Sequence, residues 1–203
     1  MAGIVAVKLD RAPESLPADV DWEHAPEVRF SADWRGQAPD PGRETRIRML
    51  WSSEDIYIRF HCCYQNLYIY EGPPCRRDRL WLRDVAEVFI QTEVDPPSCY
   101  REFEIAPSGD WLDLDIAPGS KRHLKWDLRP RAQVRPDSGY WSAEMALPLR
   151  RLIPTFDPSK IWKINFFRIE GSEPDRFYSA WRPTFTPRPN FHVPECFGEL
   201  RFQ

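Results

Sequence analysis

The sequence predicts an all-β chain, folded as a two-sheet antiparallel β-sandwich of the jelly-roll kind with long loops and very little helix. Short runs in which apolar and polar residues alternate recur from end to end, and this period of two is typical of half-buried strands. Proline occurs 21 times in 203 residues, and a proline in a helix interior removes a hydrogen bond and kinks the helix. Aromatic residues make up 14% of the chain, and they favour pleated surfaces.

The alternation places the strands in order along the chain. Residues 45–51 and 56–62 flank an acidic turn and form the clearest hairpin. Further strands are predicted at 84–92, 100–106, 111–116, 132–135, 140–147, 161–169 and 197–202. One turn of helix is expected at 149–153, between two prolines. Since no repeat or linker divides the chain, we expect one domain over residues 1–203, with a binding site near its long loops.

Charge and cysteine content limit the classes of partner. The net charge is −3, from 28 basic and 31 acidic residues, whereas nucleic acid or an anionic membrane surface calls for a basic excess. The apolar run at 2–7 is too short for a signal-peptide core, so we expect no secretory leader. The five cysteines show no CxxC pair, which predicts free thiols in a reducing, cytoplasmic compartment. A single disulfide with the remaining cysteines free is the alternative.

Three stretches of sequence, in a fixed order, carry a family resemblance. They read TRIRMLWSSEDIYIRFHC at 45–62, LWLRDVAEVFIQ at 80–91 and NFHVPECFGELRF at 190–202. Together they resemble the family 9 carbohydrate-binding modules, the cellulose- and xylan-binding domains of xylanases, from about residue 45 to residue 203. The resemblance implies a jelly-roll-like β-sandwich that binds the end of a glucan or xylan chain, or a small sugar, without catalysis.

The resemblance also implies a site. In the family two aromatic rings clamp the terminal sugar, and these positions align with Trp81 and Phe191; a carboxylate near the sugar hydroxyls aligns with Glu87. The C–H faces of a sugar are weakly positive and lie flat on the electron-rich face of a ring. Because buried hydroxyl groups need hydrogen-bond partners, polar residues are expected at the rim.

Two positions depart from the family pattern. The hydrogen-bonding Arg of the family aligns near Glu104, and its Gln aligns near Phe167. Arg168 could supply a guanidinium to the ligand, although alternation turns it to the opposite face of the strand. Trp181 resembles an aromatic near the ligand face of free-standing members, with packing in the core as the alternative.

A glycoside-processing enzyme is the first alternative function. Asp113 and Asp115 lie two residues apart on one strand, as do Glu102 and Glu104, which places each pair about 6–7 Å apart. That separation is close to the one that inverting glycosidases use. Alternating acids are also the ordinary pattern of a solvated sheet face, so we predict no catalysis.

Two cofactor hypotheses remain. A haem-binding relative of the same sandwich superfamily would need an axial ligand such as Met49 or Met145, and both are expected in the core. Family members hold structural calcium, and Asp19, Asp21 and Glu23 are a candidate remnant, although they lack a calcium-loop signature. The sequence leaves the oligomeric state open.

Overall fold

Strands dominate the computed structural model, which describes residues 3–10, 13, 15–126 and 128–203. The strands are β1 (Gly3–Lys8), β2 (Val28–Phe30), β3 (Thr45–Trp51), β4 (Asp55–Cys63), β5 (Val85–Gln91), β6 (Tyr100–Ile105), β7 (Trp111–Ala117), β8 (Ser120–His123), β9 (Arg131–Arg135), β10 (Tyr140–Pro148), β11 (Trp162–Glu170), β12 (Phe177–Ala180) and β13 (Gly198–Phe202). Helical structure within these residues consists of the four-residue helix α1 (Leu149–Leu152) and 3₁₀ turns at Asp19–His24, Pro41–Arg43, Leu80–Leu82, Pro136–Ser138 and Pro194–Cys196. The prediction of an all-β chain with little helix is confirmed.

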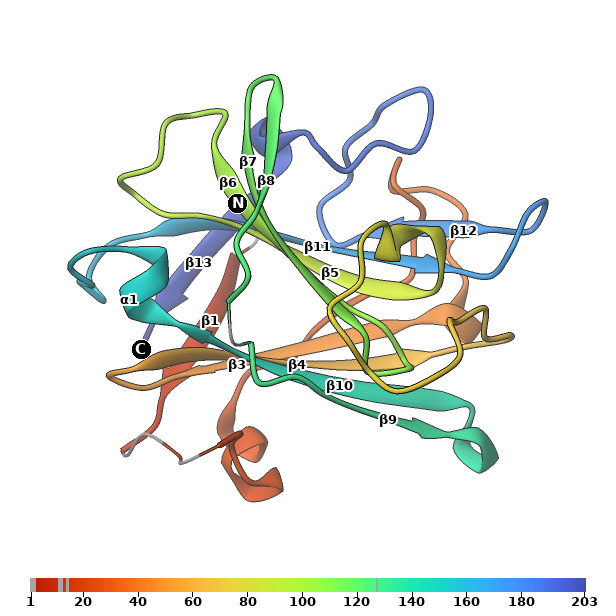
Figure 1. Cartoon of the computed structure of the whole chain (residues 1–203), viewed down its shortest axis with the longest axis horizontal. Coiled ribbons are helices and arrows are strands. Elements are labelled where there is room, and N and C mark those ends of the chain that lie inside the picture. The colour runs from red at the N-terminus through yellow and green to blue at the C-terminus, as the bar shows by residue number, and fades with distance from the viewer. Residues whose placement is uncertain (1–2, 11–12, 14, 127) are drawn as a thin grey trace.

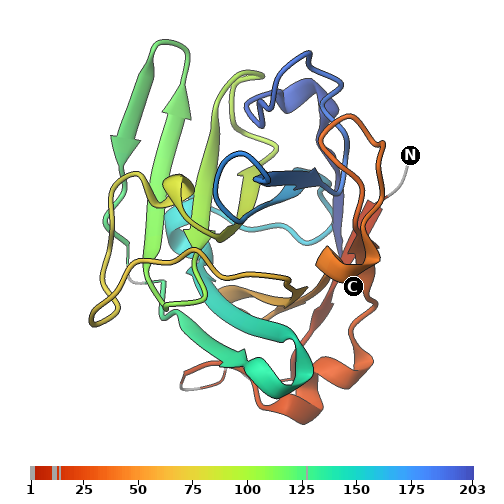
Figure 2. The ribbon, with the colours of Figure 1, turned by 90° about the vertical axis from the view of Figure 1, so that its right-hand side faces the viewer.

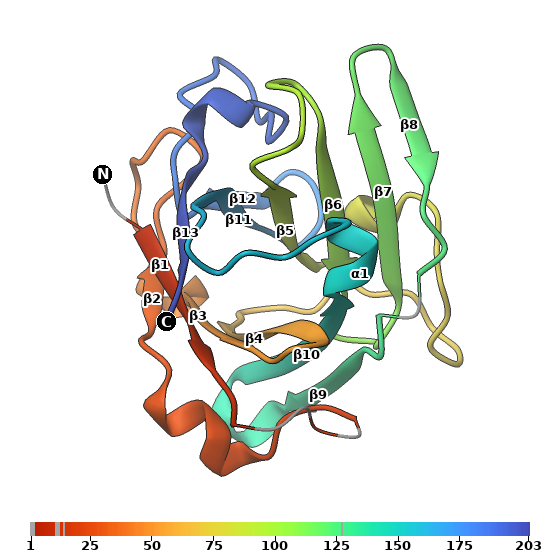
Figure 3. The same cartoon turned by 90° about the vertical axis from the view of Figure 1, so that its left-hand side faces the viewer.

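The strands form one continuous sheet that curls back on itself (Figure 1). Its order is β8-β7-β6-β5-β11-β13-β1-β3-β4-β10-β9, with β12 beside β11 and β2 beside β3. Strand β1 pairs in parallel with both β13 and β3 and so joins the two arms of the sheet (Figure 3). The prediction of a two-sheet antiparallel sandwich is thus confirmed only in its all-β character, because β1 connects the two arms into one mixed sheet through parallel pairs.

The main core lies between the two arms. Ile47, Ile58 and Met145 point into it from one arm, and Val88 and Phe166 from the other. Each of these side chains is fully buried, which stabilises the fold by roughly 1.5–3 kcal/mol per side chain. Met49 belongs to the same cluster, so both methionines considered as haem ligands are core residues.

A second buried layer covers the other face of β5, β6, β7 and β11. Val85 and Phe89 point to this face, where Leu112 and Phe167 join them, under loops that include Leu80 and residues 191–197. All seven residues of β5 are buried as a result. Any polar side chain that points to this face is consequently shielded from water.

The five cysteines are free, with Cys62 buried in the core. Burial raises the pKa of the Cys62 thiol to about 11, so it stays protonated at neutral pH. In the part of the chain that the structure describes, no helix is long and apolar enough to cross a membrane.

Candidate functional site

A hollow of about 230 Å³ opens on the second buried layer. Ten residues line it: Trp81, Glu87, Glu102, Lys121, Ile169, Tyr178, Pro189, Asn190, Phe191 and His192. They come from β5, β6, β8, β11 and β12, from the 3₁₀ turn Leu80–Leu82 and from residues 189–192, so distant parts of the chain meet here. The β7–β8 hairpin, in green, and the C-terminal loop, in blue, rise on the same side of the sheet (Figure 2). The hollow brings together three of the five predicted binding residues.

Three glutamates form the floor. Glu87 faces Glu104 across the β5–β6 ladder, and Glu102 is two residues from Glu104 on the same strand face. Their residues are only 2%, 0% and 3% exposed in that order. Among the described residues, Oε2 of Glu102 and both carboxyl oxygens of Glu104 have no hydrogen-bond partner. The carboxyl groups of Glu102 and Glu104 are therefore desolvated with few compensating contacts beyond each other and the Lys121 ammonium, which is costly for a charged group.

This burial raises the pKa of each glutamate. The effect is large for Glu87 and Glu104, where burial is the main cause and a neighbouring carboxylate adds to it. Burial also raises the pKa of Glu102, against the attraction of the Lys121 ammonium. Two like charges in one site disfavour simultaneous ionisation. The floor thus retains protons to a higher pH than exposed glutamates do.

A chain of polar contacts closes one side of the hollow. Nζ of Lys121 lies 3.0 Å from Nε2 of His192, and Nδ1 of His192 lies 2.6 Å from Oη of Tyr100. An ammonium can only donate, so Nε2 accepts and Nδ1 carries the proton that is donated to Tyr100. Burial and the nearby Lys121 lower the pKa of His192 to about 4. The imidazole is consequently neutral at neutral pH, and its ring stacks on Phe89 at 5.4 Å.

Aromatic rings make the walls. Trp81 lies in the 3₁₀ turn Leu80–Leu82, is partly exposed, and accepts a hydrogen bond from Arg176 at its carbonyl oxygen. Phe191 is only 8% exposed and stacks on Phe167 with centroids 4.2 Å apart and planes at 14°. One face of Phe191 is thus already covered. Trp81 is the wall that can offer more ring surface to a ligand.

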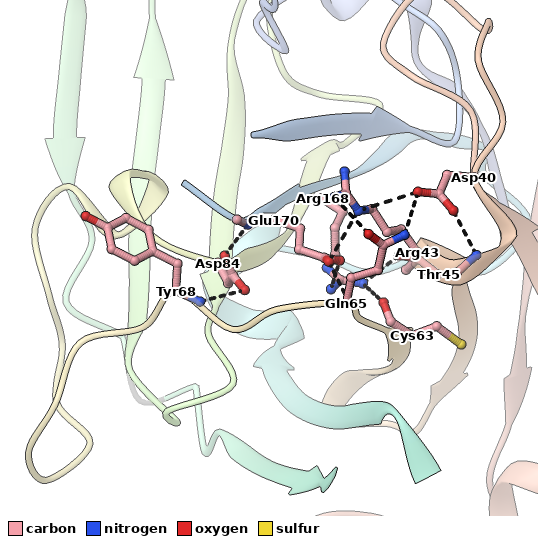
Figure 4. A network of polar contacts seen from close by, with 11 residues as sticks. Asp40, Arg43, Thr45, Cys63, Gln65, Tyr68, Asp84, Arg168 and Glu170 are labelled. Atoms are coloured by element: carbon pink, nitrogen blue, oxygen red, sulfur yellow. Dashed lines mark hydrogen bonds and ion pairs between the residues drawn. The ribbon is translucent and has the colours of Figure 1, made fainter. Parts of the chain in front are cut away.

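Arg168 lies outside the hollow and belongs to a buried ion-pair network (Figure 4). Its guanidinium donates to Glu170 at 2.7 Å and to the carbonyl oxygen of Cys63 at 3.0 Å, and it is fully buried. Arg168 was expected to offer its guanidinium to a ligand, but it does not line the hollow. Phe167 points to the second buried layer, on which the hollow opens, and strand alternation turns Arg168 to the opposite face.

Trp181 also lies away from the hollow. Its ring contacts Phe166 edge-on at 5.7 Å, and its indole packs against the main core. Of the two alternatives considered for Trp181, the structure therefore favours packing against the core. The two positions that depart from the family pattern both lie next to the hollow. Phe167 stacks on Phe191, and Glu104 completes the floor behind Glu87 and Glu102.

The other carboxylate pair is engaged in ion pairs. Asp113 is fully buried and accepts from Arg76 at 2.5 Å, while Asp115 accepts from Arg122 at 2.6 Å. The expectation of a solvated face is wrong for Asp113, as it is for Glu102 and Glu104. Alternation shows which side chains share a face of a sheet, but it does not show whether other segments cover that face.

Two of the three acidic residues considered for calcium make polar contacts within the protein. Asp19 pairs with Arg59 at 2.6 Å, and Oδ2 of Asp21 accepts from the amide of Ala18 at 2.8 Å. Glu23 lies in the same 3₁₀ turn. Across the described residues, no group of three or more His, Cys, Asp or Glu side chains is placed to hold a metal ion.

Seven of the ten residues of the hollow were not predicted to bind a ligand; apart from Glu102, which was considered for catalysis, the polar ones are Lys121, Tyr178, Asn190 and His192. Asn190 and His192 flank Phe191 inside a stretch already singled out, so their position was a usable signal. Lys121 lies on a short exposed strand that the alternation did not reveal. Tyr178 lies on β12, a four-residue strand that the alternation did not predict.

Comparison with known proteins shows distant sequence relatives. No family model matches the chain. A protein of Arthroderma benhamiae named "Extracellular protein" is 22% identical over 192 residues, which cover 86% of this chain and 85% of that protein. The UPF0462 protein C4orf33 homolog of Rattus norvegicus is 27% identical over 181 residues, which cover 77% of this chain and 87% of that protein.

Solved structures give a stronger likeness in three dimensions. A candidate carbohydrate-binding protein from Bacteroides uniformis superposes with a TM-score of 0.79 at 16% identity, over 99% of both chains. A family 9 carbohydrate-binding module from Caldicellulosiruptor kristjanssonii in complex with cellotriose has a TM-score of 0.69 at 13% identity, over 100% of this chain and 94% of the module. The glucose complex gives a TM-score of 0.68. The curled, β1-joined sheet described above is thus the fold of the family 9 carbohydrate-binding modules.

Proposed function

We propose that this protein binds a carbohydrate in the hollow between Trp81 and Phe191 and does not transform it. One observation carries the proposal: the two aromatic residues and Glu87, picked out by sequence alone, line one hollow on a fold shared with modules solved with cellotriose and glucose. An aromatic wall stacks on the C–H face of a sugar, and carboxyl groups below it accept from or donate to hydroxyls.

The size of the hollow favours the end of a chain or a single sugar. Its volume of about 230 Å³ is below the roughly 300–1,000 Å³ of pockets that enclose drug-sized ligands. A ligand that places one ring inside and leaves the rest in solvent fits this space. Cellulose-type and xylan-type chain ends are both candidates, because both offer a terminal pyranose.

Isothermal titration calorimetry with glucose, cellotriose and xylotriose tests the proposal. We expect weak binding, on the order of micromolar to millimolar, that becomes about tenfold weaker when Trp81 is replaced by Ala. Phe185→Ala is the matched control, because Phe185 is 71% exposed and does not line the hollow. If none of the sugars binds to the purified protein, or if both variants lose binding equally, the proposed site is wrong.

Glycoside cleavage is the second candidate function. It is favoured by the placement of Glu87 and Glu102 in the same hollow, both with a raised pKa, since a general acid needs a carboxyl that keeps its proton. Release of reducing ends from cellotriose or xylotriose, abolished in Glu87→Gln, would establish this activity in place of simple binding. We expect no such release.

A further inference from the structure

The hollow combines acidic groups with aromatic walls. Glu87 and Glu102 line it, Glu104 lies directly behind them, and three lining residues, Trp81, Tyr178 and Phe191, are aromatic. Among the described residues, Oε2 of Glu102 has no hydrogen-bond partner although the residue is only 3% exposed, and Nδ1 of the neutral His192 lies 4.0 Å from it. A buried carboxylate without a partner favours a ligand that brings a hydrogen-bond donor, and most of all a charged donor.

Lys121 shows where a cation fits. Its Nζ lies 5.4 Å from the centroid of the Trp81 ring, within the range of a cation–π contact. The same ammonium favours ionisation of all three glutamates of the floor. Lys121 is exposed and lies on the outermost strand of its arm, four residues long. Its flexible side chain can therefore leave this position without disturbing the core.

We infer that the hollow selects a sugar that carries a protonated amine, whose ammonium takes the place of Lys121 Nζ against Trp81 and faces Glu102 and Glu87. This inference rests on the proposed function and names its ligand class. A neutral hydroxyl gains an ordinary hydrogen bond from the floor, whereas an ammonium gains charge-assisted bonds that are roughly twice as strong. An anionic sugar would meet the carboxylates as a like charge and be rejected.

Selection for the amine depends on pH through every charged or titratable group around the hollow. These are Glu87, Glu102, Glu104, Tyr100, Lys121, Arg176, Tyr178, His192 and Glu195. The glutamates must be ionised to attract the amine, and their pKa values are raised. Preference for the aminated sugar should therefore grow as pH rises from acidic to neutral, and then fall when the ligand amine loses its proton.

Calorimetry with three matched sugars tests the inference: D-glucosamine, D-glucose and N-acetyl-D-glucosamine, which removes the charge but keeps the nitrogen. We expect the wild-type protein at neutral pH to bind glucosamine about tenfold or more tightly than the other two. The preference should shrink at high salt. In Glu102→Gln the ratio of glucosamine to glucose affinity should approach one, while Glu54→Gln, an exposed glutamate in the β3–β4 turn, should keep the wild-type ratio.

Lys121→Met provides a second variant that does not alter the floor. Removal of the competing ammonium should tighten glucosamine binding several-fold relative to glucose. Equal affinity for the three sugars in the wild-type protein would overturn the inference and leave the proposed function intact. Absence of binding by these sugars and by cellotriose would overturn both. A melting curve for each variant separates lost binding from lost folding. The comparison of the three sugars on the wild-type protein tests the inference even if a variant does not fold.

Discussion

Nζ of Lys121 lies 3.0 Å from Nε2 of His192, across 71 residues of sequence. This contact joins the β7–β8 hairpin to the segment that carries Phe191, and so it links two sides of the hollow. His192 in turn rests on Phe89 of β5. The mouth of the hollow is therefore bounded by a polar contact between two surface segments, above a floor fixed by strand pairing.

Trp81 should matter for binding and little for stability. The residue is partly exposed, so Trp81→Ala is expected to weaken sugar binding about tenfold with a nearly unchanged melting temperature. Trp162→Ala is the contrasting variant, because Trp162 is fully buried and its truncation should cost about 3–5 kcal/mol of unfolding free energy. Calorimetric titration and differential scanning calorimetry measure the two effects. A large fall in melting temperature for Trp81→Ala would place this residue in the core.

Loss of one partner of the Arg168–Glu170 pair should destabilise the protein strongly. Both side chains are almost completely buried and their charged atoms lie 2.7 Å apart. Glu170→Leu leaves a buried guanidinium unpaired, and we expect a loss of about 3–5 kcal/mol in urea unfolding. The double variant Arg168→Leu/Glu170→Leu should recover part of that loss, since no lone charge remains. A double variant less stable than the single one would contradict this account.

The glutamate floor should make stability fall as pH rises. Glu104 has a pKa well above its ordinary value of 4.5, so the folded protein binds more protons than the unfolded chain above about that pH. Stability contributed by the protonated form is present below the unfolded pKa and is lost as pH rises through the folded pKa. Unfolding free energy measured against pH should decline less steeply in Glu104→Gln than in the wild type. Identical slopes would show that Glu104 does not titrate differently on folding.

His192 should remain neutral in mildly acidic solution. Its pKa is lowered to about 4 by burial and by Lys121, so its ring resonances should titrate near that value, with the proton on Nδ1 above it. Lys121→Met should raise the pKa of His192, because the opposing positive charge is gone. NMR titration of ring nitrogen shifts follows both effects. A His192 that titrates near 6.5 in the wild type would mean that neither the burial of its ring nor its contact with Lys121 persists in solution.

Much of the sheet could be predicted from sequence because side-chain alternation is a local property. A period of two predicts the hairpin of β3 and β4, the strand β5, and the position of Arg168 on the face of β11 opposite to Phe167. Whether a face is covered depends on segments far away in the chain, so the burial of Glu102 and Glu104 could not be read from their spacing. Lys121 was missed for the same reason, since only folding brings it to His192.

The parallel pairing of β1 has a consequence for how the protein is made. Gly3 lies opposite Glu199 and Ala6 opposite Met49, so one short strand supplies hydrogen bonds to both arms of the sheet. While the chain is being synthesised, β3 can find β1 early, but β13 leaves the ribosome long afterwards. Contacts of such high sequence separation form slowly. Until they form, β1 keeps an unpaired edge that can recruit other strands, and chaperone protection should matter most in that interval.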